Sequence, residues 1–186
     1  MKIGLKSKTV KIIEYDPEWK NEYLKEKTIL NNALKNYDVD IQHVGSTSII
    51  GCKAKPIIDI AIGIQNLEYG KKLIPVLEKI GYYYNDTVSF DGSYFLKKCK
   101  DNIETHFIHI ENKNGKSWQN HIIFRDYMNL NSIEVVKYSN LKEILSQKFY
   151  NDRKCYTKAK ETYIQKTIDK ALKHFNLLTK DSDYTI

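Results

Sequence analysis

The amino-acid sequence predicts an α+β fold: a mixed β-sheet with flanking helices, followed by a helical C-terminal region. Residues 57–64, IIDIAIGI, are β-branched at five of eight positions and almost wholly apolar. Such a run is typical of a strand that is covered on both faces in the middle of a sheet. Helical and strand-like segments are interleaved up to residue 110, and from Ser117 onward apolar residues recur only at helical spacing.

The first predicted element is a helix over residues 17–37. It begins after Asp16, because an aspartate can accept hydrogen bonds from the free amides of a helix start and proline is tolerated at the first helical position. Aromatic and aliphatic residues then recur at helical spacing, and they predict a buried stripe made of Trp19, Tyr23, Leu30, Ala33 and Tyr37.

Short strands and one helix are predicted in the middle of the chain. Residues 40–44 form a strand that enters a Gly-Ser turn, and residues 67–80 form a helix that ends at Gly81. Three further strands are predicted at 82–88, 93–99 and 104–110, with turn signals at Asn85-Asp86, Asp91-Gly92 and Asp101-Asn102.

The rest of the chain is predicted to be helical, with breaks at residues 129–132 and 151–152. The last helix spans residues 156–175, and its apolar stripe contains Ile164, Ile168, Leu172 and Phe175. We therefore expect one compact unit with two parts. Residues 1–116 form the α+β core, and residues 117–186 form a helical region that packs on it.

Length and composition fit a folded, cytoplasmic protein. The 186 residues are 41% hydrophobic and 28% charged, which is typical of a single folded unit. No apolar run approaches the roughly 20 residues of a membrane span, and the N-terminus has no hydrophobic signal core. Three widely spaced cysteines fit reduced thiols. These features predict no membrane partner.

Positive charge is concentrated near the C-terminus. The formal net charge is +7, and residues 141–180 carry ten Lys or Arg against four acids. A basic element attracts phosphates or acidic surfaces, and a solvated helix face gives the same pattern. Aromatic stacking in a basic groove is typical of single-strand binding. Because the 14 tyrosines fall mostly on predicted core stripes and strands, the sequence does not favour nucleic acid as a partner.

A lone carboxylate interrupts the apolar strand, thirteen positions after the Gly45-Ser46 turn. A buried carboxylate needs a partner, and the neighbouring isoleucines offer none. Asp59 therefore either lies near the exposed end of the strand, is neutralised by Lys55, or binds a divalent cation that faces phosphates held at the turn. A glycine beside a serine lets the backbone approach such a ligand.

At this point the residues resemble a known family. Gly-Ser followed by an acid in an apolar strand is similar to the signature of the nucleotidyltransferase superfamily. The segments HVGSTSIIGCKAKPIIDI, THFIHI, FRDY, KYSNLKEILSQKF and DRKCYTKAK resemble the GrpB family of bacterial proteins, which is assigned to that superfamily. The resemblance runs from about residue 12 to residue 171. It implies a nucleotidyltransferase-like fold.

The resemblance also implies a function. It is the Mg²⁺- or Mn²⁺-dependent transfer of a nucleotidyl or phosphoryl group from a nucleoside triphosphate, or another phosphorylated small molecule, to an unknown acceptor. The alternative is a module with the same fold that binds a nucleotide or phosphorylated metabolite without catalysis. Superfamily enzymes usually carry a second acid two residues after the first, where this chain has Ala61. That difference favours the alternative and leaves enzymatic activity open.

The sequence and the resemblance together give a set of candidate site residues. Asp59 and His109 are the catalytic candidates. The nucleotide- or phosphate-binding candidates are Gly45, Ser46, Thr47, Lys55, Arg125, Lys142 and Lys158. The metal-binding candidates are Asp59, Glu104 and His106.

Several of these residues have a structural interpretation as well. His106 and His109 fall on opposite faces of a regular strand, so both reach one site only if the strand is bulged. Either can be a metal ligand, a general base, a phosphate partner or a hydrogen-bonded structural histidine. Arg125 can reach a phosphate or form a local ion pair with Asp126. His43 is expected to be structural, and His121 and His174 to lie at the surface.

Overall fold

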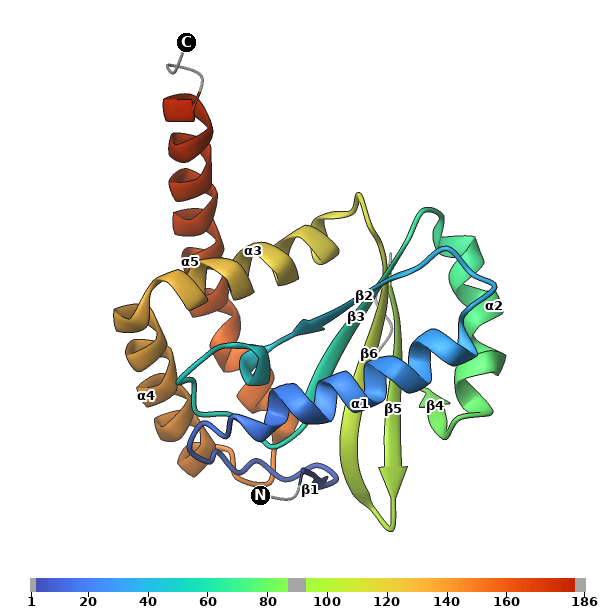
Figure 1. Ribbon diagram of the computed structural model, residues 1–186. Helices are drawn as coiled ribbons and strands as arrows, with labels where there is room; N and C mark the ends of the chain where they lie inside the picture. The colour runs from blue at the N-terminus through green and yellow to red at the C-terminus, as the bar shows by residue number, and fades with distance from the viewer. Residues whose placement is uncertain (1–2, 87–92, 183–186) are drawn as a thin grey trace.

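The structure is a computed structural model that describes residues 3–86 and 93–182 (Figure 1). Its helices are α1 (Glu18–Ala33), α2 (Leu67–Glu78), α3 (Lys116–Leu130), α4 (Ser132–Lys148) and α5 (Arg153–Ser182), with a short 3-10 helix η1 (Ser46–Ser48). Its strands are β1 (Leu5–Lys6), β2 (Asp40–Val44), β3 (Ile58–Ile64), β4 (Tyr82–Tyr84), β5 (Ser93–Lys100) and β6 (Ile103–Asn112).

The strands form one mixed sheet in the order β2-β3-β6-β5-β4, and β1 pairs with β6 outside this path. The pair β3 and β6 is parallel, whereas the other pairs are antiparallel. The predicted α+β class, with a mixed sheet and a helical C-terminal region, is therefore confirmed. The strand that contains Asp59 is an interior strand, as its apolar run predicted.

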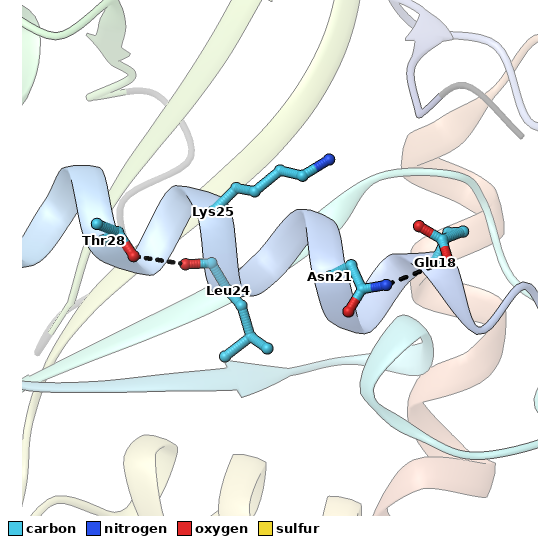
Figure 2. Close-up of a pocket in the computed structure, with 5 residues that line it drawn as sticks. All are labelled: Glu18, Asn21, Leu24, Lys25 and Thr28. Atoms are coloured by element: carbon cyan, nitrogen blue, oxygen red, sulfur yellow. Dashed lines mark hydrogen bonds between the residues drawn. The ribbon is translucent and has the colours of Figure 1, made fainter.

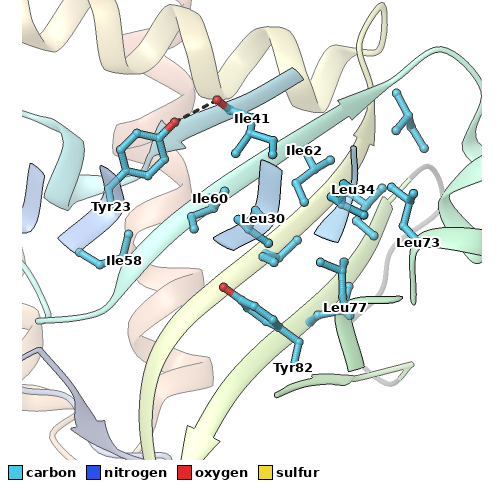
Figure 3. Packing of buried hydrophobic residues seen from close by; sticks show 14 of the residues in the cluster. Tyr23, Leu30, Leu34, Ile41, Ile58, Ile60, Ile62, Leu73, Leu77 and Tyr82 are labelled. Carbon is cyan, nitrogen blue, oxygen red and sulfur yellow. Dashed lines mark hydrogen bonds between the residues drawn. The ribbon is translucent and has the colours of Figure 1, made fainter. Parts of the chain in front are cut away.

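Alternate residues of β3 face two different layers. Ile58, Ile60 and Ile62 pack with residues of α1 and α2, including Leu30 and Leu73, in the main core (Figure 3). The other face of β3 is covered by α3, and a Cβ atom at Gly63 would lie 2.8 Å from the ring of Trp118. The face that carries Asp59 is thus the one on which the C-terminal helices pack.

A second apolar cluster joins α3, α4 and α5 to the segment that follows η1. Its buried members are Ile49, Cys52, Phe124, Met128, Val135, Tyr138 and Ile168. Ile168 confirms part of the stripe predicted for the last helix, but Leu172 is exposed. The C-terminal part of α5 extends beyond the other helices (Figure 1). This cluster holds the C-terminal helices against the loop that leads into β3.

Most predicted elements are present with small shifts at their ends. The long helix begins at Arg153 instead of residue 156, because the carboxylate of Asp152 accepts a hydrogen bond from the amide of Cys155 at 3.0 Å and caps it. The sequence did not predict β1 or the bridge between Ile13 and Ala54. Residues 87–88 of the strand predicted at 82–88 and the predicted Asp91-Gly92 turn lie outside the described residues.

None of the helices in the described ranges 3–86 and 93–182 is both long and apolar enough to span a membrane.

Candidate functional site

The Gly45-Ser46 turn lies directly against Asp59. Val44 at the end of β2 pairs with Asp59 at the start of β3, so the chain turns beside the carboxylate. Gly45 has φ +69° and ψ −170°, a conformation that is essentially restricted to glycine. A Cβ atom at this position would lie 2.6 Å from Asp59 Oδ2. Only glycine therefore lets the backbone approach the carboxylate this closely.

His43 and Thr47, which flank the Gly45-Ser46 turn in the sequence, are joined by a side-chain hydrogen bond. The Nε2 atom of His43 lies 3.0 Å from the hydroxyl oxygen of Thr47, and its ring stacks on Tyr23 at 4.6 Å. Burial lowers the pKa of His43 to about 4, so this histidine is neutral at physiological pH. This arrangement agrees with the structural role predicted for His43. It also gives the buried Thr47 hydroxyl a partner inside the fold.

Asp59 is an ionised carboxylate at the start of its strand. Its side chain is 29% exposed, and its Oδ1 lies 3.8 Å from Nε2 of His109, which is 28% exposed. Burial raises the pKa of Asp59. His109, Lys55 and Lys160 together lower it by more than burial raises it, so the net shift is downward. Of the two structural explanations considered for this acid, the position near the end of the strand is present in the fold, and Lys55 acts on Asp59 electrostatically without forming an ion pair with it.

Two lysines, Lys55 and Lys160, act electrostatically on Asp59, and Lys142 acts on both of these lysines. The Nζ atoms of Lys55 and Lys160 lie 5.9 Å and 4.5 Å from the ring centroid of Tyr156. Burial first, and then neighbouring positive charges, lower the pKa of Lys55 to about 8 and that of Lys160 to about 7. Lys142 is fully buried, and its Nζ donates to the carbonyl of Lys53 and lies 3.0 Å from Cys52 Sγ. Positive charge therefore collects beside one carboxylate.

The predicted metal ligands are not brought together. The Nε2 atom of His106 lies 3.9 Å from Glu26 of α1, on the face of the sheet opposite to Asp59. Glu104 accepts hydrogen bonds from Arg153, from Lys97 and from the hydroxyl of Ser7. In the part of the chain that the structure describes, no three His, Cys, Asp or Glu side chains gather as metal ligands.

A β-bulge explains why Glu104 and His106 lie on different faces. Lys98 of β5 pairs with His106 and Cys99 pairs with Glu104, so Thr105 is the extra residue. Because the bulge comes before His106, the regular alternation still separates His106 from His109. The prediction that these two histidines fall on opposite faces is confirmed, and a shared metal ion at Asp59 and His106 is excluded by that geometry.

Arg125 is bonded to groups of the fold other than Asp59, and Lys158 is exposed. The Nη1 atom of Arg125 donates to Gln42 Oε1 and to the carbonyl of His43, both at 3.0 Å, and Nε donates to Asp126 at 2.7 Å. These contacts include the local ion pair considered from the sequence, and they join α3 to β2. Lys158 is exposed on α5.

Sequence reasoning missed two parts of this face. His121 was predicted at the surface, but its side chain is only 33% exposed and its Nδ1 lies 3.1 Å from Glu111 Oε2. Burial lowers the pKa of His121, and the bond and charge of Glu111 raise it more. Glu111 follows His109 by two residues on β6, so strand alternation could have placed it on this face. Likewise, Lys160 follows Tyr156 by four residues, which is one helical turn.

A hollow lies on the exposed side of α1, away from Asp59, and is lined by Glu18, Asn21, Leu24, Lys25 and Thr28 (Figure 2). Its side chains bond within the helix itself: Asn21 donates to Glu18 at 3.1 Å, and Thr28 donates to the carbonyl of Leu24 at 3.0 Å. It offers no converging set of polar groups, so the face around Asp59 is the better candidate site.

The fold and this site define an α+β protein in which a glycine turn contacts one carboxylate, and two lysines act electrostatically on that carboxylate. A sequence profile of the family described as GrpB protein matches residues 9–170. The chain therefore belongs to the GrpB family, as its sequence motifs indicated.

Similar proteins extend over almost the whole chain. The "Glutamate-rich protein GrpB" of Alkalihalophilus pseudofirmus is 34% identical over 171 residues, which cover 90% of this chain and 98% of the relative. The crystal structure of the conserved protein GrpB from Enterococcus faecalis has a TM-score of 0.80 and 30% identity, and the match covers 89% of this chain and 99% of that chain.

A more distant match is a structure of the Cid1 poly(U) polymerase bound to MgATP. It has a TM-score of 0.49 and 16% identity, and covers 72% of this chain and 46% of that chain. A likeness at this level does not place the chain in a superfamily.

Proposed function

We propose that the protein binds the phosphate groups of a nucleoside triphosphate, or of another phosphorylated small molecule, at the Gly45-Ser46 turn beside Asp59. The observation that carries this proposal is the contact between the turn and the acid, where a Cβ atom at Gly45 would lie 2.6 Å from Asp59 Oδ2. A glycine of this kind lets backbone groups approach a ligand. The adjacent Lys55 supplies positive charge for a phosphate.

A phosphate and the ionised Asp59 repel each other unless a cation lies between them. Mg²⁺ or Mn²⁺ fits this need, because hard divalent cations take carboxylate and phosphate oxygens as ligands. Two ions held by paired carboxylates do not fit, because Ala61 is fully buried against Val44 and Trp118. The residues fit one ion, with Asp59 as the protein ligand. When bound, such an ion would neutralise charge on the phosphate.

Transfer of a nucleotidyl or phosphoryl group is the reaction that this arrangement supports. His109 is placed to act as a general base, since its Nε2 lies 3.8 Å from Asp59 Oδ1 and its ring is partly exposed. It would take the proton of an acceptor hydroxyl as that oxygen bonds to the phosphorus and the bond from the phosphorus to the leaving oxygen breaks, which releases pyrophosphate in nucleotidyl transfer or the nucleoside diphosphate in phosphoryl transfer. Membership of the GrpB family and the motif resemblance to nucleotidyltransferases support this assignment.

The second candidate is a binding module without catalysis. It is favoured by Ala61, which leaves Asp59 without a second carboxylate on its strand face. Such a module would bind its phosphorylated ligand even after metal ions are chelated.

Calorimetric titration with each nucleoside triphosphate, with Mg²⁺ and then with EDTA, tests the proposal. The wild type should bind at least one of them with Mg²⁺, and Asp59→Ala should lose about tenfold or more of that affinity. Asp38→Ala is the matched control, because Asp38 is an exposed acid outside the site. The proposal fails if no nucleotide or phosphorylated metabolite binds, or if Asp59→Ala binds as the wild type does.

An assay that follows release of pyrophosphate and of the nucleoside diphosphate then separates the two candidates. Metal-dependent release that His109→Gln abolishes supports transfer. Binding that survives EDTA, without release from any triphosphate, supports the binding module.

A further inference from the structure

We infer that Lys55, Lys160 and the hydroxyl of Tyr156 form an anion site that holds a phosphate group without a metal ion, next to the Gly45-Ser46 turn. The inference extends the proposed function and rests on it only in placing a phosphate at the turn. It assigns to α5 a direct part in ligand binding.

The first observation is an unpaired hydroxyl. Tyr156 is fully buried, and its hydroxyl has no hydrogen-bond partner among the described residues. Buried hydroxyl groups in folded proteins are nearly always hydrogen-bonded. Cys52 and Tyr138 lie close enough to affect the pKa of Tyr156 electrostatically, and neither donates a hydrogen bond to its hydroxyl or accepts one from it. A phosphate oxygen is a natural acceptor for this donor.

The second observation is a set of lysines without carboxylate partners. None of the ion pairs among residues 3–86 and 93–182 involves Lys55, Lys142 or Lys160. Lys53, by contrast, pairs with Glu14 at 2.8 Å and Glu143 at 2.9 Å. Asp59 acts electrostatically on Lys55 and Lys160, Glu104 also acts on Lys55, and Lys142 is a positive neighbour of both lysines. The group therefore carries positive charge that an anion would balance.

The third observation concerns access. Lys142 is fully buried and donates to Cys52 and to the carbonyl of Lys53, so its ammonium group is held inside the fold and is not available to a ligand. Lys55 and Lys160 are only half-buried, and both lie near the ring of Tyr156. Their ammonium groups are therefore accessible to a ligand.

The helix also explains why Lys160, and not Lys158, is in the site. Residues four apart on an α-helix lie on one side, whereas residues two apart point in nearly opposite directions. Lys160 therefore shares the buried side of Tyr156, and Lys158 is exposed.

The position of Asp59 decides which phosphate compound fits. Asp59 contacts the turn and also interacts electrostatically with Lys55 and Lys160. Two anionic groups, one at the turn and one at the lysines, are thus neighbours around one carboxylate. A chain of linked phosphates can occupy both positions, whereas a single phosphate occupies one of them, so the ligand class that we infer is a diphosphate or triphosphate.

Calorimetric titration of the full chain in EDTA with inorganic tripolyphosphate, pyrophosphate and orthophosphate tests the inference. Tripolyphosphate and pyrophosphate should bind more tightly than orthophosphate. Lys160→Met should weaken tripolyphosphate binding by about tenfold, because it removes a charged donor. Lys166→Met, an exposed lysine of the same helix, should bind as the wild type does.

Tyr156→Phe keeps the ring and removes a hydroxyl that has no partner in the described fold, so it is expected to fold normally and still lose several-fold affinity. Asp59→Asn should bind tripolyphosphate more tightly than the wild type in EDTA, since it removes the negative charge beside the lysines. Nucleoside triphosphates in the same buffer show whether a base adds affinity over the inorganic phosphate chain.

Two results overturn the inference. One is that the wild type fails to bind tripolyphosphate in EDTA. The other is that Lys160→Met and Tyr156→Phe both bind it as the wild type does. If Asp59→Ala still loses Mg²⁺-dependent nucleotide binding in that case, the proposed function stands alone. If the two α5 variants lose tripolyphosphate binding but no triphosphate is turned over, the inference stands and transfer is refuted.

Discussion

Replacing Gly45 with alanine tests whether the turn is packed against Asp59. At φ +69° and ψ −170° the backbone is in a region that residues with a Cβ atom rarely adopt. The added methyl group would lie 2.6 Å from Asp59 Oδ2, 2.9 Å from its Cβ and 3.0 Å from its Cγ. All three distances are shorter than a van der Waals contact, so either the turn or the carboxylate must move.

Two penalties add in this variant. The backbone conformation costs about 1–3 kcal/mol, and inserting a methyl group into packed space costs about 1–3 kcal/mol. We therefore expect Gly45→Ala to lower the free energy of unfolding by about 2–6 kcal/mol. In a protein of this size, each 1 kcal/mol lowers Tm by about 2–4 °C. Urea unfolding followed by circular dichroism measures the loss.

Gly51→Ala is the matched control. Gly51 also has a positive φ, +74°, but no atom lies within 4 Å of the position of an added Cβ. It therefore carries backbone strain without the contact, and Gly45→Ala should cost about 1–3 kcal/mol more. Equal losses in the two variants would refute the packing of the turn against Asp59, and with it the geometry on which the proposed function depends.

Three further predictions concern charges around the two faces of the sheet. Glu111 raises the pKa of His121 against the effect of burial, so this pair stabilises the fold below the unfolded histidine pKa of about 6.5 and the gain is lost as pH rises through the folded value. Glu111→Gln should therefore cost more stability at pH 6 than at pH 9 in urea unfolding, and an equal cost at both would contradict the pairing. On the α1 face, the buried Glu26 accepts hydrogen bonds from Tyr82 at 2.9 Å and Lys98 at 2.6 Å. Glu26→Gln should therefore lower the free energy of unfolding by about 2 kcal/mol. The control Glu22→Gln breaks a surface pair with Lys25 and should lower it by less than about 1 kcal/mol. Metal-free tripolyphosphate binding should weaken from pH 6 to pH 9, because burial lowers the pKa of Lys160 to about 7 and that of Lys55 to about 8. The titratable and charged neighbours of these lysines include Asp59, Lys142, Arg153 and Cys52. Calorimetry in two buffers with different ionisation enthalpies should show proton uptake on binding, and an affinity that does not change with pH would argue against lysine ligands.

Much of the fold was predictable because its signals are local. The apolar run that became β3, the Asp16 start of α1 and the breaks between the C-terminal helices depend on side-chain periodicity and on capping residues. Strand alternation alone separated His106 from His109. The spacing from Gly45-Ser46 to Asp59 predicted that the turn and the acid face each other.

The parts that failed depend on contacts between distant segments. The bulge at Thr105 moved Glu104 to the face where Arg153 lies, and no local pattern announces such an extra residue. His121 carried no sequence signal for burial by itself, because its partner Glu111 comes from a strand and not from its own helix. Arg125 looked free for a ligand, yet Gln42 and the carbonyl of His43 on β2 accept its hydrogen bonds.

The sequence by itself determined the α+β class, the family, the order of the elements and the pairing of a glycine turn with one carboxylate. These properties follow from the periods of the strand and the helix and from residue types at fixed spacing. Only the tertiary structure decided which cations accompany Asp59. A helix has a local period but no local preference for a distant strand, so the packing of the C-terminal helices on the Asp59 face selected Lys160 over Lys158 and buried Tyr156 beside it.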